Sequence, residues 1–410
     1  MLCVYKFGGA SVKDANGVKN LKRIVTDYPG SKLLIIVSAM GKSTNLLEKI
    51  VSRKIDKEDF YPDLGLFFSY HDEICRELFG TQPLEVSDLR FALERSLEME
   101  IADPLEFQDL IVSYGELFST MIVSKYIGTK WMDARHLIKT DSKFTEGEVD
   151  WEKTHIAISE GVSEELENGT VITQGFIGSD ATGKTTTLGR EGSDFSAAIF
   201  AHCLDAASVT VWKDVPGLLN ADPKVFPSAE KFDHISYQEV IEMTYYGAKV
   251  IHPKTIRPLA QKNIPLFVRS FIDPEGEGTR ISEDQKIANK TCFVFKENQL
   301  LVSVRVRDNS FMDEHKMSFI LLALSQFNIK ANLTHNSALT FTICMDNNIT
   351  KRDRLVEHLS ESYQVLYNED LFMATIKNYD EASFGLLPAN IEPIFEEKSR
   401  SNYQVVYRVK

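Results

Sequence analysis

The sequence predicts an α/β protein in which a parallel-rich central sheet carries helices on both faces and is followed by small ferredoxin-like modules. Two observations carry this prediction. The amino-terminal residues have the pattern of a strand, a helix and a second strand, which is the βαβ order of a parallel sheet. Beyond about residue 296, short strand and helix patterns follow one another in the β-α-β-β-α order of a ferredoxin-like module.

The composition is that of a globular protein with more than one domain. At 410 residues the chain exceeds the size at which a single core stops growing, roughly 250 to 300 residues. The 46 Lys and Arg and 59 Asp and Glu residues give a formal charge of -13, which disfavours nucleic acids and anionic membranes as partners. The five cysteines are far apart and lack metal-ligand spacing, so we expect reduced thiols and no metal held by the protein. The apolar runs are far shorter than a membrane span, and we expect a cytoplasmic protein.

The first βαβ unit starts at the amino terminus. Leu2 to Phe7 form an apolar run that ends at the glycine pair Gly8-Gly9. Apolar residues at helical spacing follow, and Leu33 to Val37 form a second buried strand. Because parallel sheets bind their ligands at the carboxyl ends of the strands, the glycine pair lies where a ligand site is expected.

The remainder of the first domain is expected to add a helical layer and more strands. From about 45 to 115 the pattern is helical, with few strand signals. Strand patterns return at 130–133, 170–177, 208–212 and 265–270, and helical patterns occur at 194–203 and 237–245. A polar stretch at 273–284 follows, so we expect this domain to cover residues 1–275.

Residues 296–410 are expected to form two small modules. Strand patterns at 299–306, 329–334 and 339–345 alternate with helical patterns at 313–326 and 349–362. Two further strands are expected at 371–376 and 403–409, with a short helix between them. We therefore predict a complete first module at 296–365 and an abbreviated second module at 366–410.

The string from Gly178 to Thr185, GSDATGKT, matches the phosphate-loop pattern but is not expected to act as one. A phosphate loop opens directly into a helix. Here Thr185 to Thr187 are three consecutive β-branched residues, and Gly189 and Gly192 follow closely. This pattern favours a hairpin or an extended glycine-rich loop.

The segment from Lys6 to Ser11, KFGGAS, lies at the end of the first predicted strand. Glycines there let backbone amides approach phosphate oxygens, and the lysine adds a positive charge. Taken alone, the segment fits equally well a tight turn with a solvated lysine.

Three further loops carry charged residues and glycines. In Leu188 to Asp194, LGREGSD, an arginine stands beside a helix start that suits an anion, although Ser193 or Asp194 could also act only as a helix cap. The other two loops each carry a lysine: Val211 to Gly217, VWKDVPG, and Gly247 to Pro253, GAKVIHP.

Together these motifs resemble those of the aspartate kinases of the amino acid kinase superfamily. The shared motifs, in the family's order and close to its spacing, are KFGG, Val37-Ser38-Ala39 with Thr44-Asn45, Gly115-Glu116, LGREGSD, WKDVPG and GAKVIHP. The resemblance covers residues 1 to 272. It implies the amino-acid-kinase fold and ATP-dependent phosphorylation of the β-carboxylate of L-aspartate to 4-phospho-L-aspartate, a first step towards lysine, threonine and methionine.

The resemblance also implies roles for individual residues. Lys6 and Asp194 would be catalytic, with Asp194 orienting Lys6. The substrate would be bound by Ser38, Ala39, Thr44, Glu116, Arg190, Gly192 and Ser193, with Glu116 facing the amino group and Arg190 holding the α-carboxylate. The nucleotide would be bound by Lys6, Gly8, Gly9, Ser11, Lys213, Asp214, Leu219, Lys224, Lys249 and Val250. The attacking carboxylate is ionised at neutral pH and needs no general base, and the Mg²⁺ that accompanies ATP is expected to be held mainly by phosphates.

The sequence departs from the family's pattern at several positions. Glu191 stands where many members have Gly, and it adds a negative charge beside Arg190 unless its side chain points to solvent. Lys213, Leu219 and Lys224 replace a common Thr, Tyr and Arg, and Leu219 cannot reproduce a hydroxyl contact.

Two other functions stay open on the sequence alone. One is a kinase for glutamate, carbamate or a nucleotide, although Thr44, Glu116 and Arg190 together favour an α-amino acid with an acidic side chain. The other is a degenerate kinase that senses amino acids without turnover, which the departures at Glu191, Lys213 and Leu219 favour.

The region from about residue 296 resembles the paired ACT regulatory domains of the same family, which bind amino-acid end products. Side chains near Met317 and Asn336 would either line an effector pocket or pack a dimer interface. Because exposed strand edges need covering, we expect a homodimer or higher homo-oligomer. Whether lysine, threonine or no effector inhibits the enzyme is not readable from the sequence.

Overall fold

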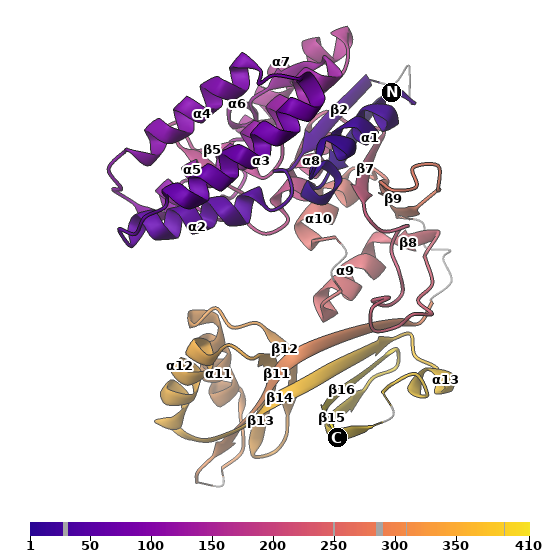
Figure 1. Cartoon of the computed structure of the whole chain (residues 1–410). Helices are drawn as coiled ribbons and strands as arrows, with labels where there is room; N and C mark the ends of the chain where they lie inside the picture. The colour runs from indigo at the N-terminus through magenta and orange to yellow at the C-terminus, as the bar shows by residue number, and fades with distance from the viewer. Residues whose placement is uncertain (28–31, 249–250, 284–289, 309, 389) are drawn as a thin grey trace. The chain divides into compact units, whose positions relative to one another are not determined.

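The structure is a computed structural model that describes residues 1–27, 32–248, 251–283, 290–308, 310–388 and 390–410. The chain folds into two compact units (Figure 1). The first comprises Met1–Leu218, Lys231–Ile241 and Val250–Ile287, and the second comprises Leu219–Glu230, Glu242–Lys249 and Ala288–Lys410.

The first unit is built on an eight-stranded sheet with the strand order β3-β4-β2-β1-β7-β9-β10-β8. Its strands are β1 (Leu2–Phe7), β2 (Lys32–Val37), β3 (Lys130–Met132), β4 (Val171–Gln174), β7 (Ser208–Lys213), β8 (His234–Ser236), β9 (Leu266–Ser270) and β10 (Thr279–Ser282). All neighbours from β3 to β9 pair in parallel, whereas β10 is antiparallel to β9. The predicted parallel-rich sheet is confirmed, and the polar stretch at 273–284 contains β10, which the sequence pattern did not indicate.

The register of the central strands brings three chain segments to one edge of the sheet. Phe7 of β1 pairs with Val37 of β2 on one side and with Trp212 of β7 on the other. The rings of Phe7 and Trp212 stack with an interplanar angle of 4°, and both side chains are fully buried. The residues that follow these three strands therefore leave the sheet side by side, as expected of a ligand site in a parallel sheet.

Helices cover both faces of this sheet (Figure 1). On one face lie α7 (Trp151–Asn168), α8 (Gly192–Cys203) and α10 (Pro253–Gln261). On the other lies α5 (Pro104–Ile127), against which α1 (Ala15–Thr26), α2 (Ser43–Ile55), α3 (Tyr61–Phe79) and α4 (Leu84–Leu97) pack. The expected helical layer is confirmed, whereas α7 and α10 were not predicted. The shorter elements are η1 (Gly9–Val12), α6 (Ala134–Leu137) and α9 (Tyr237–Tyr246).

The phosphate-loop-like string lies in a hairpin, as predicted. β5 (Ile177–Ser179) and β6 (Thr185–Thr187) pair antiparallel, and the string spans the turn between them. Lys184 points to the surface, where its Nζ lies 2.7 Å from a carboxylate oxygen of Glu106. No helix follows the string directly, so it has no phosphate-loop geometry.

The second unit contains a six-stranded antiparallel sheet with the order β12-β13-β11-β14-β16-β15. Its strands are β11 (Cys292–Val306), β12 (Ala331–Asn336), β13 (Thr340–Asp346), β14 (Tyr363–Lys377), β15 (Ile391–Lys398) and β16 (Asn402–Val409). The helices are α11 (Glu314–Gln326), α12 (Ile349–Ser360) and α13 (Glu381–Phe384). The predicted strands and helices are present, and β15 is an additional strand.

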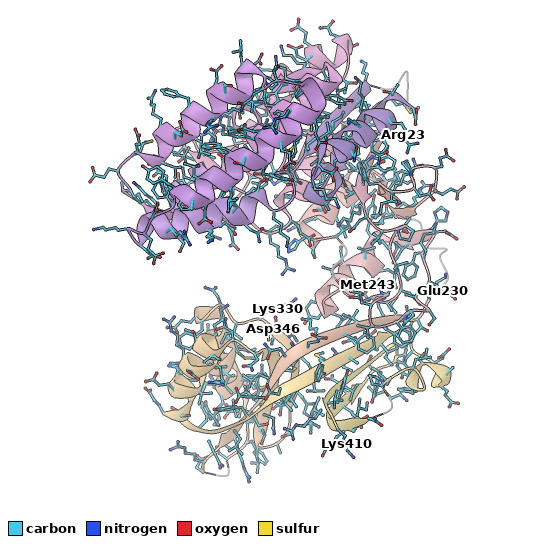
Figure 2. All side chains as sticks on the ribbon, in the orientation of Figure 1. Arg23, Glu230, Met243, Lys330, Asp346 and Lys410 are labelled. Atoms are coloured by element: carbon cyan, nitrogen blue, oxygen red, sulfur yellow. The ribbon has the colours of Figure 1, made fainter. Side chains whose placement is uncertain are left out.

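The long strands β11 and β14 run through both halves of this sheet. Their pairing is irregular between Lys296 and Leu301, and the apolar residues on either side of this irregularity belong to different core clusters. Figure 2 draws the side chains of this unit, including Lys330, whose Nζ donates to the carbonyl oxygen of Tyr245 at 3.2 Å. In the described residues, none of the helices combines the length and apolar character that a membrane span requires.

Candidate active site

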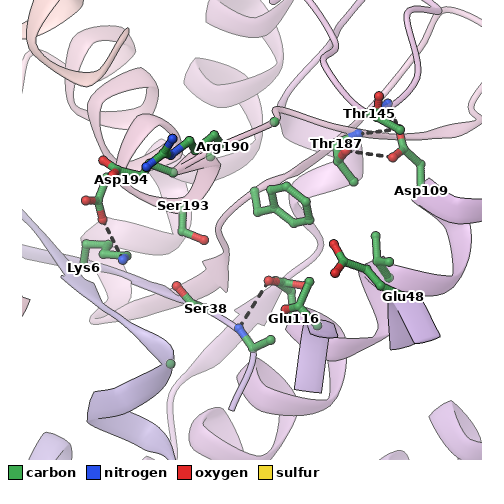
Figure 3. Close-up of a pocket in the computed structure, with 18 of the residues that line it drawn as sticks. Lys6, Ser38, Glu48, Asp109, Glu116, Thr145, Thr187, Arg190, Ser193 and Asp194 are labelled. Atoms are coloured by element: carbon green, nitrogen blue, oxygen red, sulfur yellow. Dashed lines mark hydrogen bonds and ion pairs between the residues drawn. The ribbon is translucent and has the colours of Figure 1, made fainter. Parts of the chain in front are cut away.

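A cavity of about 580 Å³ opens at the carboxyl ends of β1, β2 and β7 (Figure 3). The predicted site residues that line it are Lys6, Gly9, Ser38, Ala39, Thr44, Glu116, Arg190, Gly192, Ser193, Asp194 and Lys213. These residues come from segments that are up to about 200 positions apart in the sequence. The fold therefore gathers all of the predicted substrate-binding residues and both predicted catalytic residues around one space.

The charges at one end of the cavity centre on Asp194. Lys6 Nζ lies 2.6 Å from Asp194 Oδ1, and Lys213 Nζ lies 3.5 Å from Asp194 Oδ2. Burial by itself would raise the pKa of Asp194, but the two ammonium groups outweigh it and hold that pKa below its usual value. Two lysines around one carboxylate leave a surplus positive charge, which suits an anion.

Gly8 and Gly9 differ in how closely neighbouring atoms surround them. A Cβ on Gly9 would come within 2.5 Å of the carbonyl oxygen of Ala39, so only glycine allows these two backbones to approach this closely. A Cβ on Gly8 would make only an ordinary contact with Lys6 Nζ. Ser11 is buried, and its hydroxyl donates to the carbonyl oxygen of Trp212 at 3.4 Å.

Glu116 is a buried carboxyl group at the other end of the cavity. Its Oε1 accepts a hydrogen bond from the amide of Ala39 at 3.3 Å, and its Oε2 is buried without a hydrogen-bond partner in the described part of the chain. Burial raises the pKa of Glu116 to about 8. A cationic group beside Oε2 would satisfy this oxygen and ionise the carboxyl.

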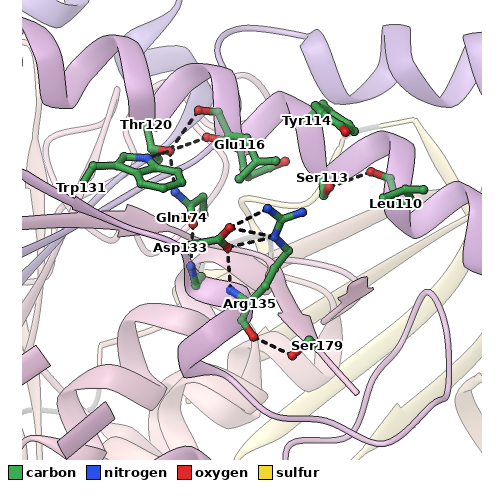
Figure 4. Close-up of polar contacts among 12 residues, drawn as sticks. Leu110, Ser113, Tyr114, Glu116, Thr120, Trp131, Asp133, Arg135, Gln174 and Ser179 are labelled. Carbon is green, nitrogen blue, oxygen red and sulfur yellow. Dashed lines mark hydrogen bonds and ion pairs between the residues drawn. The ribbon is translucent and has the colours of Figure 1, made fainter. Parts of the chain in front are cut away.

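A polar network behind Glu116 fixes this part of α5 to the sheet (Figure 4). Thr120 Oγ1 donates to the carbonyl oxygen of Glu116 at 2.8 Å and accepts from Trp131 Nε1 and Gln174 Nε2. Gln174 Oε1 in turn accepts from the amide of Ala134 at 2.7 Å. Each of these polar atoms is satisfied, so the network holds α5 and β4 in one register.

Arg190 is an exposed guanidinium at the mouth of the cavity, in the turn before α8. It forms no ion pair with any of the described residues, and Ser193 and Asp194 at the start of α8 lie beside it (Figure 3). An arginine next to a helix start offers planar donors to a carboxylate.

Glu191 precedes α8 in the left-handed conformation, with φ +54°. A side chain in this conformation is strained, which gives a physical reason for the glycine that many aspartate kinases have there. The side chain lines the cavity, and its Oε2 is buried without a hydrogen-bond partner in the described part of the chain. Glu191 therefore does contribute a carboxylate to the cavity wall.

Asp109 lines the same cavity but was not predicted from the sequence. Its carboxylate accepts hydrogen bonds from the amides of Thr145 and Thr187, both at 2.8 Å, and from Thr187 Oγ1 at 2.7 Å. Burial raises the pKa of Asp109 despite these bonds. Asp109 thus ties the loop at 139–150 and the β5–β6 hairpin to α5. Its spacing of seven residues from Glu116, on the same helix face, is a signal that the sequence did contain.

Phe176 is a second wall residue that the sequence reasoning missed. It adopts φ +71°, an uncommon conformation for a bulky side chain. The amide of Phe176 donates to Ser196 Oγ at 2.9 Å, and its carbonyl oxygen accepts from the amide of Leu188 at 2.9 Å. No local sequence pattern predicts such a residue, because contacts with distant segments impose its backbone conformation. Glu48 and Thr187 are also wall residues that were not predicted.

The predicted nucleotide-binding residues are not all gathered at the cavity. Lys6, Gly9 and Lys213 line it, whereas Gly8 and Ser11 lie in the adjacent turn and Asp214 is exposed at the end of β7. Leu219 and Lys224 belong to the second unit. Lys249 and Val250 lie outside the described residues.

The fold and the site define an α/β enzyme whose cavity is built to hold anions between lysines and an arginine. The chain belongs to the amino acid kinase family: the sequence profile of that family, described as "Amino acid kinase family", matches residues 1–270. It is thus a kinase, a phosphotransferase.

Within this family, individual relatives that match this chain are aspartokinases. The lysine-sensitive aspartokinase 3 of Escherichia coli (strain K12) is 31% identical over 361 residues, which are 84% of this chain and 78% of that protein. The chloroplastic aspartokinase 1 of Arabidopsis thaliana is 32% identical over 321 residues, 74% of this chain and 56% of that protein. These relatives confirm the resemblance to aspartate kinases that the motifs indicated.

Solved structures of an aspartokinase match this chain over almost its whole length. E. coli aspartokinase III in complex with aspartate and ADP matches with a TM-score of 0.84 and 28% identity, over 99% of this chain and 96% of that chain. The same enzyme in complex with lysine and aspartate matches with a TM-score of 0.81 and 28% identity, over 99% of this chain and 95% of that chain.

The burial of Glu116 predicts a pH-dependent effect of Glu116→Gln on stability. The folded protein keeps the Glu116 proton up to a pH of about 8, whereas the unfolded chain releases it near 4.5, so this residue lowers stability as the pH rises between these values. We expect the variant to be more stable than the parent by about 1 to 3 kcal/mol at pH 8, and by little at pH 4.5. Urea unfolding at both pH values measures this, with Glu48→Gln, an exposed carboxyl of the same cavity, as the control. Equal pH dependence of the two variants would contradict the assignment.

The left-handed backbone at residue 191 predicts that Glu191→Gly stabilises the protein. Removing a non-glycine side chain from this conformation recovers about 1 kcal/mol, less a few tenths for the greater freedom of glycine in the unfolded chain. Thermal or urea unfolding checks the gain. Glu191→Gln keeps the backbone strain and removes only the charge, so it serves as the matched control. A glycine variant no more stable than the glutamine variant would show that the strain is not significant.

Proposed function

We propose that this kinase transfers the γ-phosphoryl group of ATP to the β-carboxylate of L-aspartate. The observation that carries the proposal is the charge arrangement of one cavity: Lys6 and Lys213 flank Asp194 at one end, and Arg190 and the unsatisfied carboxyl of Glu116 lie around the remainder. An amino acid with two carboxylates and one ammonium group complements this arrangement. The aspartokinase relatives support the same substrate.

Glu116 and Arg190 would bind the backbone end of aspartate. The substrate ammonium group would pair with Glu116 Oε2, which lacks a hydrogen-bond partner in the described residues, and would bring the pKa of about 8 down so that the carboxyl ionises. Arg190 would hold the α-carboxylate through paired N–H donors. Thr44, in the first turn of α2, and Ser193, in the first turn of α8, add hydroxyl groups to the wall.

The phosphoryl transfer itself needs positioning and charge neutralisation. An oxygen of the ionised β-carboxylate attacks the γ-phosphorus, the bond from that phosphorus to the bridging oxygen breaks, and ADP leaves with the bond's electron pair. No proton is removed, so no general base is required. Lys6 would offset the negative charge that meets at the γ-phosphoryl group, and Asp194 would keep Lys6 in place.

We propose that the Mg²⁺ ion accompanying ATP is held mainly by the phosphates of the nucleotide. In the described residues, no three His, Cys, Asp or Glu side chains gather where they could hold a metal, and Asp194 is already engaged by two lysines. A Mg²⁺ ion accompanying ATP would supply additional charge neutralisation at the phosphates. The contributions of Gly8, Ser11, Asp214, Leu219, Lys224, Lys249 and Val250 to nucleotide binding stay predictions.

We further propose that residues 1–275 are the catalytic domain and that 296–365 and 366–410 are ACT-like modules. The second unit supports two modules because its sheet has two halves with separate core clusters, although the strands β11 and β14 run through both halves and β14 (Tyr363–Lys377) itself crosses residue 365. Lysine is the first effector to test, since one relative is named lysine-sensitive and one matching structure contains lysine. The cytoplasmic location expected from the sequence stays a prediction.

A coupled assay for ADP release tests the substrate. With ATP and Mg²⁺ we expect turnover with L-aspartate and at least about 100-fold less with L-glutamate, because an extra methylene displaces the carboxylate from the in-line position. Lys6→Ala should lower kcat by about 100-fold or more, since it removes the charge beside the transferred group. Lys184→Ala, in the phosphate-loop-like string, is the matched control and should leave the rate unchanged. Equal rates with the two amino acids would overturn the substrate assignment.

The exposed edge strands β12 and β15 predict self-association. An unpaired strand edge is a template for pairing with another chain, so we expect a homodimer or higher homo-oligomer. Sedimentation velocity at micromolar concentration measures the mass directly. A chain of 46.4 kDa that sediments as a monomer would rule the prediction out.

A further inference from the structure

The first unit contains a second cavity, of about 700 Å³, that lies outside the site described above. Its wall is formed by the loop at 143–149, the first residue of α7, one face of α8 and one face of α10. None of its lining residues lines the first cavity. Its volume falls within the range of small-molecule sites, about 300 to 1,000 Å³.

Aromatic side chains gather at this cavity. The ring of Trp151 lies 5.1 Å from that of His202 and 6.3 Å from that of Phe195, in edge-on arrangements. His202 Nδ1 lies 2.9 Å from the carbonyl oxygen of Pro258, which fixes the orientation of the imidazole. Trp151 remains 38% exposed although its neighbours are partly buried, so a face of the indole is available to a planar ligand.

Cations at the rim favour an anionic ligand. Lys254 and Arg257 lie one turn apart on the exposed face of α10, and neither forms an ion pair within the described ranges. On the opposite loop, Lys143 is already paired with Glu146 at 3.4 Å. Glu148 is the other carboxylate of the lining, so the α10 side carries the positive charge that a ligand would meet.

The loop at 143–149 separates the two cavities and contributes to both. Thr145 lines the catalytic cavity, where its amide donates to Asp109, whereas Glu146 and Gly147 line the second cavity. The amide of Gly147 donates to the carbonyl oxygen of Thr187 at 2.8 Å, and Thr187 is again a catalytic-cavity residue. A ligand that shifts this loop would therefore move the wall of the catalytic cavity.

Helix α8 links the two cavities in the same way. Ser193 and Asp194 in its first turn line the catalytic cavity, whereas Phe195 and His202, seven residues apart on one helix face, line the second. Two independent connections, one through the loop and one through the helix, join the second cavity to the residues that would bind aspartate and phosphate.

We propose that the second cavity is a regulatory site for a small aromatic carboxylate, with the ring on Trp151 and His202 and the carboxylate on Lys254 and Arg257. Its occupant changes the affinity of the catalytic cavity for aspartate. This last step rests on the proposed function, whereas binding to the second cavity does not.

Isothermal titration calorimetry of the full chain with 3-phenylpropionate tests the binding. We expect saturable binding, with quenching of tryptophan fluorescence, and at least tenfold weaker binding of 3-cyclohexylpropionate, which lacks the planar ring, and of 3-phenylpropanamide, which lacks the charge. The Lys254→Ala/Arg257→Ala double variant should bind 3-phenylpropionate at least tenfold more weakly. Arg95→Ala, an exposed arginine in the last turn of α4 that lines neither cavity, should bind it as the parent does. No saturable binding, or equal binding of the three compounds, would overturn the proposal.

The coupling is measured by repeating the 3-phenylpropionate titration at saturating aspartate. Binding free energies are coupled reciprocally, so a regulatory site requires the Kd for 3-phenylpropionate to change, and we expect a change of at least threefold. An unchanged Kd would overturn the regulatory role. Absence of aspartate phosphorylation in the coupled assay would instead overturn the proposed function. The titration with 3-phenylpropionate in the absence of aspartate does not depend on the outcome of that assay.

Discussion

The contact between Lys6 and Asp194 is the constraint on which the arrangement of the site depends. An isolated buried charge is costly, so Lys6, which is 8% exposed, and Asp194, which is 3% exposed, stabilise each other where they lie. The pair joins the end of β1 to the first turn of α8, two elements nearly 190 residues apart in the sequence. Lys213 at the end of β7 shares the same carboxylate. Three segments are thereby held around one surplus positive charge.

Other parts of the cavity wall are held in place at a cost to stability. Glu116 carries a buried oxygen without a hydrogen-bond partner in the described residues, and Phe176 and Glu191 adopt left-handed backbone conformations. The network through Thr120 and Gln174 keeps α5 rigid enough to hold Glu116 in its buried position. Such local costs are typical of sites whose groups are satisfied only when a ligand binds.

The sequence predicts much of the fold because most elements have a clear local pattern. The hairpin at 177–187 was readable from its β-branched residues, even though its string matches a phosphate loop. In contrast, α10 contains Pro258 in its interior, and β15 contains Pro393 and three glutamates, so each element carries residues that disfavour the structure it forms. Charged site residues were predicted through their motifs. Phe176 was missed because its conformation comes from contacts with other segments, whereas Asp109 was missed although it lies seven residues before Glu116 on the same face of α5.

The central claim is that Asp194 serves the phosphoryl end of the cavity by holding Lys6 and Lys213. The steady-state kinetics of Asp194→Asn test it most directly, with circular dichroism to establish that the variant is folded. We expect a kcat lower by about 100-fold or more, with a KM for aspartate within about threefold of the parent, because an interaction made at the transferred group acts mainly in the transition state. An unchanged kcat with a strongly raised KM for aspartate would contradict it.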